Sequence, residues 1–159
     1  MSESLKSRME RWVLNLWPCY RGSGGRISYV RHDYTRVRVR IPLTWRTRNY
    51  VGSIYGGSMY GAIDPIYMMM LIRILGPDYT VLDKAADVRF KKMGKTTLWA
   101  DFHLTEDELQ TIRDTLQTQE KLDREYMVEL KDADGVVHTQ INKVIHIRKR
   151  KRNGAPAPG

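Results

Sequence analysis

The first apolar residues of the chain recur at the spacing of an amphipathic helix. Between Ser4 and Trp17 they follow one another at steps of three and four residues, with charged side chains between them. These apolar positions are Leu5, Met9, Trp12, Val13 and Leu16. Pro18 ends the pattern, because proline has no backbone N–H for a helix interior. The pattern predicts a helix over residues 4–17, followed by a flexible glycine-containing turn at residues 21–25.

The pattern then changes to strict alternation. From Tyr34 to Ile41 one set of alternating positions carries Tyr and three arginines, and the other carries Thr, two valines and Ile. Alternation of this kind is typical of an antiparallel strand with one buried and one solvated face. Strand signals begin already at Ile27, and further strands are predicted at 81–90, 96–104, 125–130 and 136–147. A capping-box pattern at 105–108 predicts a helix between the second and third of these.

A long apolar segment, Met59 to Leu75, separates the early strands from the later ones. Its only strongly polar interruptions are Tyr60, Asp64 and Arg73. A helix that is apolar all round is buried on most sides. Pro65 predicts a kink, or a helix that starts near the proline. The order of elements predicts an α+β fold in which an antiparallel sheet surrounds one central helix.

Composition narrows the possible classes of protein. The 159 residues suit one domain, and the apolar fraction of 42% is that of a globular chain. Cys19 is the lone cysteine, which excludes an internal disulfide framework and a cysteine-based zinc site. The four histidines show no metal-ligand spacing, so no metal site is predicted. The longest apolar run has seven residues and no secretory signal is visible, so we expect a cytoplasmic protein without a membrane span.

The net charge of +9 is unevenly distributed. Residues 148–152 are all Arg or Lys and supply five of these charges, and a tail rich in Gly and Pro follows them. Such a run could bind nucleic acid or an anionic membrane surface. The simpler interpretation is a solvated end of the last strand followed by a tail.

The loop before the apolar segment carries the candidate chemistry. Asn49, then Tyr55-Gly56-Gly57, then Asp64 resemble the hotdog-fold thioesterases of the phenylacetic-acid-degradation type. That family has Asn, His-Gly-Gly and Asp at this spacing, with the Asp on the central helix. The order of elements from about residue 34 to residue 148 resembles that family too. The amino-acid sequence of the loop is most similar to an uncharacterised bacterial branch of the superfamily. Tyr55 stands where the family commonly has histidine.

The resemblance implies a hotdog domain at 27–148, with residues 1–26 as an added N-terminal helix and loop and 149–159 as a basic tail. It also implies a homodimer or tetramer with sites shared between subunits. In such a site the Asn and the Gly-Gly loop of one subunit face the Asp of the other. The implied substrate is an acyl thioester, usually of coenzyme A, and no further cofactor is expected.

Thioester hydrolysis builds negative charge on the carbonyl oxygen, and amides at a helix N-terminus can stabilise it. Gly56 and Gly57 are the candidate donors, Asp64 the candidate base or nucleophile, and Asn49 the candidate orienting group. Tyr55 retains a phenol that can donate one hydrogen bond. Structural alternatives stand beside these roles: Asp64 could cap a helix restarted at the proline, the glycines could serve loop geometry, and Asn49 could be a local turn residue.

Basic residues flank the turn after the first strand that follows the central helix. They are Arg89, Lys91, Lys92 and Lys95, and their position is similar to where such families place the nucleotide end of coenzyme A. Arginine and lysine both bind phosphate, although a solvated basic turn would look the same. The leading hypothesis is an acyl-CoA thioesterase. The alternatives are a non-catalytic acyl-binding or acyl-CoA-binding module, favoured by Tyr55, and, with less support, a nucleic-acid-binding protein.

Overall fold

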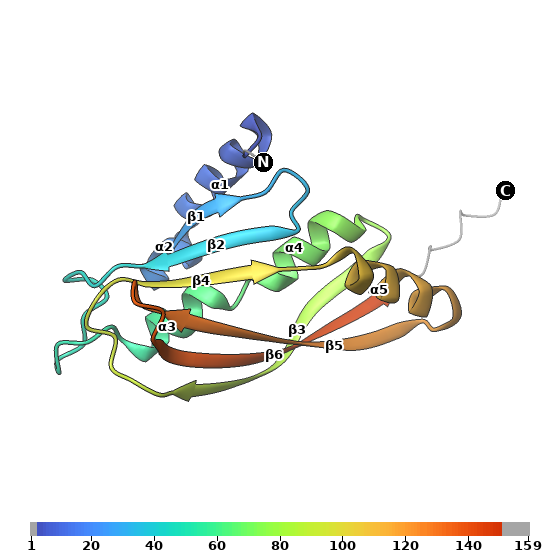
Figure 1. The fold of residues 1–159 in the computed structure, drawn as a ribbon. Helices are drawn as coiled ribbons and strands as arrows, with labels where there is room; N and C mark the ends of the chain where they lie inside the picture. Colours follow the sequence, from blue (N-terminus) through green and yellow to red (C-terminus); the bar gives the residue numbers. More distant parts are fainter. Residues whose placement is uncertain (1–2, 151–159) are drawn as a thin grey trace, which may run out of the picture.

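A computed structural model describes residues 3–150. Of the tail predicted at 149–159, Lys149 still belongs to the last strand, and residues 151–159 lie outside the described residues. Six strands form one antiparallel sheet in the order β1-β2-β4-β5-β6-β3, as Figure 1 shows. The strands are β1 (Arg26–Val30), β2 (Arg36–Ile41), β3 (Tyr79–Phe90), β4 (Leu98–His103), β5 (Lys121–Lys131) and β6 (Val137–Lys149). The helices are α1 (Leu5–Leu16), α2 (Pro18–Ser23), α3 (Gly56–Ile63), α4 (Ile66–Leu75) and α5 (Glu106–Thr118).

The sheet curves around α3 and α4, which together form the predicted central helix (Figure 1). The helix breaks at Asp64 and Pro65, where the proline predicted a kink. Ile63, Ile66 and Met70 are almost fully buried against the sheet. By length and composition the stretch from Gly56 to Leu75 could cross a membrane. Its burial in the sheet identifies it instead as the core helix of the fold.

Strand β2 shows how the alternating pattern positions the core. Val37, Val39 and Ile41 are fully buried, whereas the arginines between them are exposed. The observed β5 is longer than the predicted strand. The hydrophobic pattern missed its added residues because they alternate only between exposed and half-buried positions. The sequence pattern missed α2 altogether. Pro18 does end α1, but it also occupies the first turn of the next helix, where its missing N–H costs nothing.

Helix α1 contacts the sheet through its polar side. The Asn15 side-chain amide accepts a hydrogen bond from the Ile27 N–H (2.8 Å) and donates one to the Ile27 carbonyl (2.9 Å). The carboxylate of Glu3 accepts the N–H of Val30 at 3.2 Å. An exposed strand edge is a site for unwanted pairing, and here polar side chains of α1 and of the residues just before it occupy the edge. The apolar side of α1 faces away from the sheet.

A half-buried ion pair joins α5 to β5. Thr105 caps α5 by accepting the Glu108 N–H, as the capping-box pattern predicts. The Glu108 carboxylate does not complete that box but binds the Arg124 guanidinium and the Tyr126 hydroxyl. Burial alone would raise the pKa of Glu108, but hydrogen bonds from Arg124 and Tyr126 outweigh it and lower the pKa below 4.5.

This pKa shift predicts how the stability of a Glu108→Gln variant depends on pH. The folded pKa lies below the unfolded one, so the ionised carboxylate stabilises the fold above pH 4.5. We expect Glu108→Gln to lower the free energy of unfolding by about 1–2 kcal/mol at neutral pH. The difference from wild type should shrink as the pH falls below 4.5, because Glu108 is then protonated in the wild type as well. Urea unfolding at several pH values measures it, and a gap of constant size down to about pH 3 would contradict the assignment.

Candidate functional site

The N-terminus of α3 presents backbone amides without partners. The first intrahelical bond runs from the Met59 N–H to the Tyr55 carbonyl at 3.1 Å. Within residues 3–150, no side chain caps this end, and no group accepts the N–H of Gly56, Gly57 or Ser58. Such amides carry the positive end of the helix dipole. This helix end can therefore stabilise an oxyanion.

A pocket of about 410 Å³ opens beside this helix end. It brings together four of the residues singled out in the sequence: Asn49, Gly56, Lys91 and Lys92. Its remaining lining is mostly apolar and comprises Val51, Ser53, Ile54, Met59, Phe90 and Met93. The two lysines are exposed, so the pocket combines an apolar interior with positive charge in its wall.

A side chain at position 56 would change the shape of this pocket. A Cβ atom there would lie 2.9 Å from the Phe90 ring, closer than real side chains approach. At Gly57 a Cβ would lie 2.3 Å from the ring of Tyr55, which folds back over the start of the helix and is largely exposed. Both positions thus let other groups approach the helix end closely.

His138 of β6 fixes the backbone that carries the two lysines. Its carbonyl accepts the N–H groups of Lys91 (2.8 Å) and Lys92 (3.1 Å). Its buried ring contacts the Met93 carbonyl through Nδ1 (3.1 Å) and the Asp132 carboxylate through Nε2 (2.9 Å). That contact lowers the pKa of Asp132. The basic loop is therefore held rigidly against the sheet.

The other two predicted phosphate-binding residues do not line the pocket. Arg89 forms an exposed ion pair with Asp87 at 3.1 Å. Lys95 is exposed beyond the residues that form the wall. The structure thus separates the predicted basic cluster into Lys91 and Lys92, which reach the pocket, and Arg89 and Lys95, which do not.

Asn49 uses its side chain within its own loop. Its Oδ1 accepts the backbone N–H of Ser53 at 3.0 Å and that of Val51 at 3.2 Å, and its Nδ2 contacts the Ser53 hydroxyl at 3.0 Å. This conformation matches the structural alternative in which Asn49 is a local turn residue. Asn49 shapes the pocket wall, and a substrate would have to compete with these bonds for its amide.

Asp64 lies at the other end of α3 and outside the pocket. Its Oδ1 accepts hydrogen bonds from the Tyr60 hydroxyl (2.6 Å) and from the Lys143 ammonium (2.5 Å). No side chain caps α4, so the alternative that Asp64 caps a helix restarted at Pro65 is wrong. The Asp64 side chain is 39% exposed, and among the described residues no hydrogen bond to its Oδ2 is found.

Lys143 is the residue that sequence analysis missed. Its side chain is 1% exposed and lies between Asp64 and Asp83, the latter in an ion pair of 2.7 Å without hydrogen-bond geometry. Its ammonium also stands 5.4 Å from the centre of the Tyr60 ring. Burial disfavours the charge, but the two carboxylates outweigh it and raise the pKa of Lys143. Burial likewise raises the pKa of Asp83, against the effect of the ammonium.

The sequence did hold a signal for Lys143. Ile141, Ile145 and Ile147 are buried and lie on the same face of β6 as Lys143. A lysine at an inward position of an apolar strand face needs a buried partner, because an unpaired charge there is costly.

The helix-end pocket and the carboxylate do not form one site within a single chain. Asp64 follows Gly56 by eight residues, which places it about 12 Å further along the helix. An acyl carbon held at the Gly56 amide would lie beyond the reach of that carboxylate.

The profile of a protein family described as "Domain of unknown function (DUF4442)" matches residues 6–147. This chain belongs to that family. No curated protein matches the DUF4442 chain significantly.

Solved structures show the fold of this DUF4442 protein. A Pseudomonas aeruginosa protein of unknown function, described as a probable thioesterase, superposes with a TM-score of 0.81 at 17% identity, covering 94% of this chain and 100% of that one. A Haemophilus influenzae thioesterase gives 0.67 at 11% identity, covering 97% of each chain. A mutant thioesterase from Pseudomonas aeruginosa gives 0.66 at 11% identity, covering 94% and 97%. At these identities the likeness shows the fold, which is the hotdog fold that the resemblance implied.

Proposed function

We propose that this protein is a thioesterase that hydrolyses an acyl thioester, with acyl-coenzyme A as the favoured substrate class. One observation carries the proposal. The unpartnered amides at the start of α3 lie beside an apolar pocket whose wall includes Lys91 and Lys92. An acyl group suits such an interior, a thioester oxygen suits the amides, and the phosphates of coenzyme A suit the lysines.

In the proposed reaction the thioester oxygen accepts hydrogen bonds from the amides of Gly56 and Gly57. Asp64 of a second subunit takes a proton from water as the water oxygen adds to the carbonyl carbon. The carbon–sulfur bond then breaks, and the sulfur leaves as a thiol after gaining a proton. Tyr60 and Lys143 both hold Oδ1 of Asp64, which leaves Oδ2 for the water. Direct attack by this oxygen on the carbonyl carbon is the other route.

The separation of Asp64 from the pocket makes a homodimer part of the proposal. Because Asp64 lies about 12 Å along the helix from Gly56, the carboxylate that completes each pocket comes from a second copy of the chain. A tetramer built from two such dimers would contain the same sites. We place this enzyme in the cytoplasm, in keeping with its single cysteine.

The lysines of the pocket predict a defect in substrate binding. We expect Lys91→Glu/Lys92→Glu to raise KM for acyl-CoA by about 10-fold to 100-fold with little change in kcat, because phosphate contacts far from the thioester act mainly on binding. Lys95→Glu, a single charge reversal outside the pocket wall, is the control. The assay is release of free thiol from a panel of short, aromatic and long-chain acyl-CoAs. An equal effect of Lys95→Glu, or no turnover of any thioester in the panel, would count against the proposal.

A non-catalytic acyl-binding or acyl-CoA-binding module is the second candidate. Two observations favour it: Tyr55 replaces the usual histidine, and the Asn49 amide is committed to its own loop. Binding of an acyl-CoA without thiol release would support this candidate. Nucleic-acid binding has less support, because Arg36 and Arg38 of the basic strand face pair with Asp101.

A further inference from the structure

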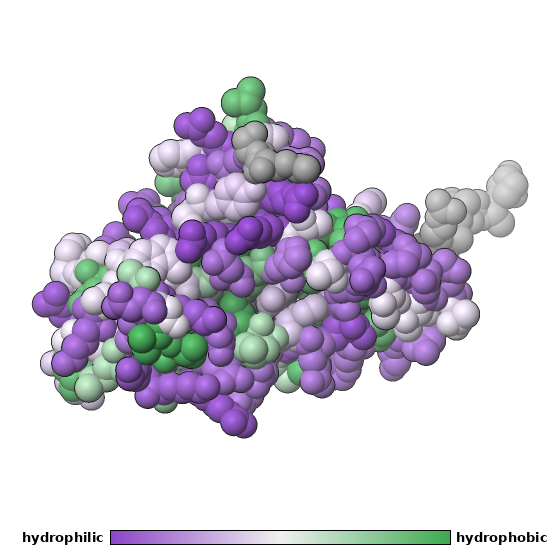
Figure 2. All heavy atoms as spheres, viewed as in Figure 1, coloured by the Kyte–Doolittle hydropathy of each residue, from purple (hydrophilic) through white to green (hydrophobic). Residues whose placement is uncertain are grey.

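Helix α1 and the residue after it expose a continuous apolar stripe. Its side chains are between 57% and 80% exposed. They are Leu5, Met9, Trp12, Val13, Leu16 and Trp17. At 3.6 residues per turn the five helical members span an arc of roughly 100°. Apolar atoms stand at the tip of the ridge that α1 forms in Figure 2.

The stripe is exposed because the opposite side of α1 is committed to the sheet. Asn15 and Glu3 bond the edge strand β1, and Ser7 is buried. Rotating α1 to bury the stripe would break these hydrogen bonds and expose the strand edge. The outward stripe is therefore a stable feature of the fold.

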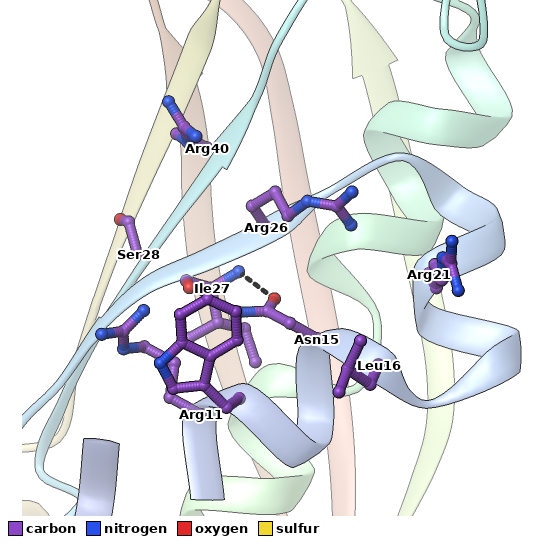
Figure 3. Close-up of a pocket in the computed structure, with 9 residues that line it drawn as sticks. Arg11, Asn15, Leu16, Arg21, Arg26, Ile27, Ser28 and Arg40 are labelled. Atoms are coloured by element: carbon purple, nitrogen blue, oxygen red, sulfur yellow. Dashed lines mark hydrogen bonds between the residues drawn. The ribbon is translucent and has the colours of Figure 1, made fainter. Parts of the chain in front are cut away.

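Unpaired arginines adjoin the stripe. A hollow of about 550 Å³ is lined by Trp12 and Leu16 from the stripe and by Arg21, Arg26 and Arg40. Figure 3 shows these arginines on three different elements: Arg21 on α2, Arg26 on β1 and Arg40 on β2. Among residues 3–150 no carboxylate pairs with any of the three, whereas Arg11 in the same wall is paired with Glu3.

Arg26 and Arg40 are direct cross-strand partners of β1 and β2. Like charges placed opposite each other destabilise a sheet. An anion bound between them would relieve this repulsion. The hollow therefore combines apolar surface with positive charge that no carboxylate of the described residues balances.

We propose that this face of the protein binds membranes that contain anionic lipids. The stripe would enter the headgroup boundary, where tryptophan is favoured, while Arg21, Arg26 and Arg40 hold lipid phosphates. Lys6 and Arg8 border the stripe on its two sides. A second copy of the chain fits less well, because a two-fold contact through this face would bring two sets of unpaired arginines into one interface and supply no carboxylate from the hollow itself.

Sedimentation of the full chain with vesicles tests this proposal. We expect binding to vesicles of phosphatidylcholine with phosphatidylserine, weaker binding to phosphatidylcholine alone, and loss of binding as salt is added. Trp12→Ser/Leu16→Ser should lower the partition coefficient at least about 10-fold. The control for this variant is Met127→Ser, which changes an exposed apolar residue of β5 away from the stripe. It should bind vesicles as the wild type does.

The charge of the hollow is tested with two matched pairs of substitutions. Arg26→Gln/Arg40→Gln should weaken binding to the anionic vesicles about 10-fold. Arg36→Gln/Arg38→Gln removes the same net charge from arginines that are already paired with Asp101, and should weaken it much less. The basic run at 148–152 is retained in every variant, so its contribution is constant.

Several results would overturn the proposal. One is no binding to the anionic vesicles, and another is binding that Trp12→Ser/Leu16→Ser leaves unchanged, which would place it elsewhere on the chain. A third is a wild type that does not bind vesicles, together with a Trp12→Ser/Leu16→Ser variant of lower oligomeric mass. That result would identify the stripe as a contact with a second copy of the chain. Binding of a DNA fragment through Arg26 and Arg40 without vesicle binding would assign the hollow to nucleic acid. Unchanged thermal unfolding of each variant shows that the fold is intact.

Discussion

Asp64→Asn is expected to lower kcat for thioester hydrolysis by about 10³-fold. The amide keeps the size of the side chain and can still accept the hydrogen bond from Tyr60. It cannot take a proton from water or attack a carbonyl carbon as a carboxylate does. KM should change little, because Asp64 lies outside the proposed substrate pocket of its own chain. Initial rates of thiol release across a range of acyl-CoA concentrations separate the two constants.

Asp83→Asn provides a matched control for this experiment. Asp83 is the other carboxylate beside the buried ammonium of Lys143, so both variants remove one of its two ionic partners. Both should therefore lose stability by a similar amount, about 1–3 kcal/mol. Only Asp64→Asn should lose turnover to the full extent. Equal losses of kcat in the two variants would show that Asp64 acts through the structure around Lys143 and not as the reacting group.

The parts of the fold that could be predicted are those that local periodicity determines. The alternation over β2 predicts a strand of the sheet, and the apolar run interrupted by Pro65 predicts the kinked central helix. Each pattern reflects which neighbouring positions are buried. The orientation of α1 could not be predicted in this way. Periodicity tells which residues share a face, but Asn15 and Glu3 bind a strand edge that forms only in the folded chain.

The candidate site was predictable to a similar degree. The loop sequence and the resemblance identified Asn49, Gly56, Lys91 and Lys92, which the fold gathers around one pocket. The Lys143 network was missed because its members come from separate parts of the chain: Asp64 from the break between α3 and α4, Asp83 from β3 and Lys143 from β6. The local bonds of Asn49 depend on the conformation of its loop, which sequence spacing does not specify.

Two inactive variants are expected to restore activity when they are combined. Gly56→Val would fill the pocket beside Phe90, whose exposed ring can move aside, so the fold should survive while the site is blocked. Asp64→Asn leaves the pocket intact but lacks the carboxylate. In a mixed dimer, the pocket of the Asp64→Asn chain meets the carboxylate of the Gly56→Val chain. One of its two sites is then complete, and the other carries both defects.

The expected recovery has a definite size. Random pairing of equal amounts of the two chains makes half of the dimers mixed, and each mixed dimer has one working site of two. The refolded mixture should therefore show about one quarter of wild-type activity, while each variant refolded alone shows almost none. A site contained in one chain would give no recovery, because every chain would still carry a defect. Recovery near one quarter would thus establish that Asp64 of one chain acts in the pocket of the other, as the proposed function requires.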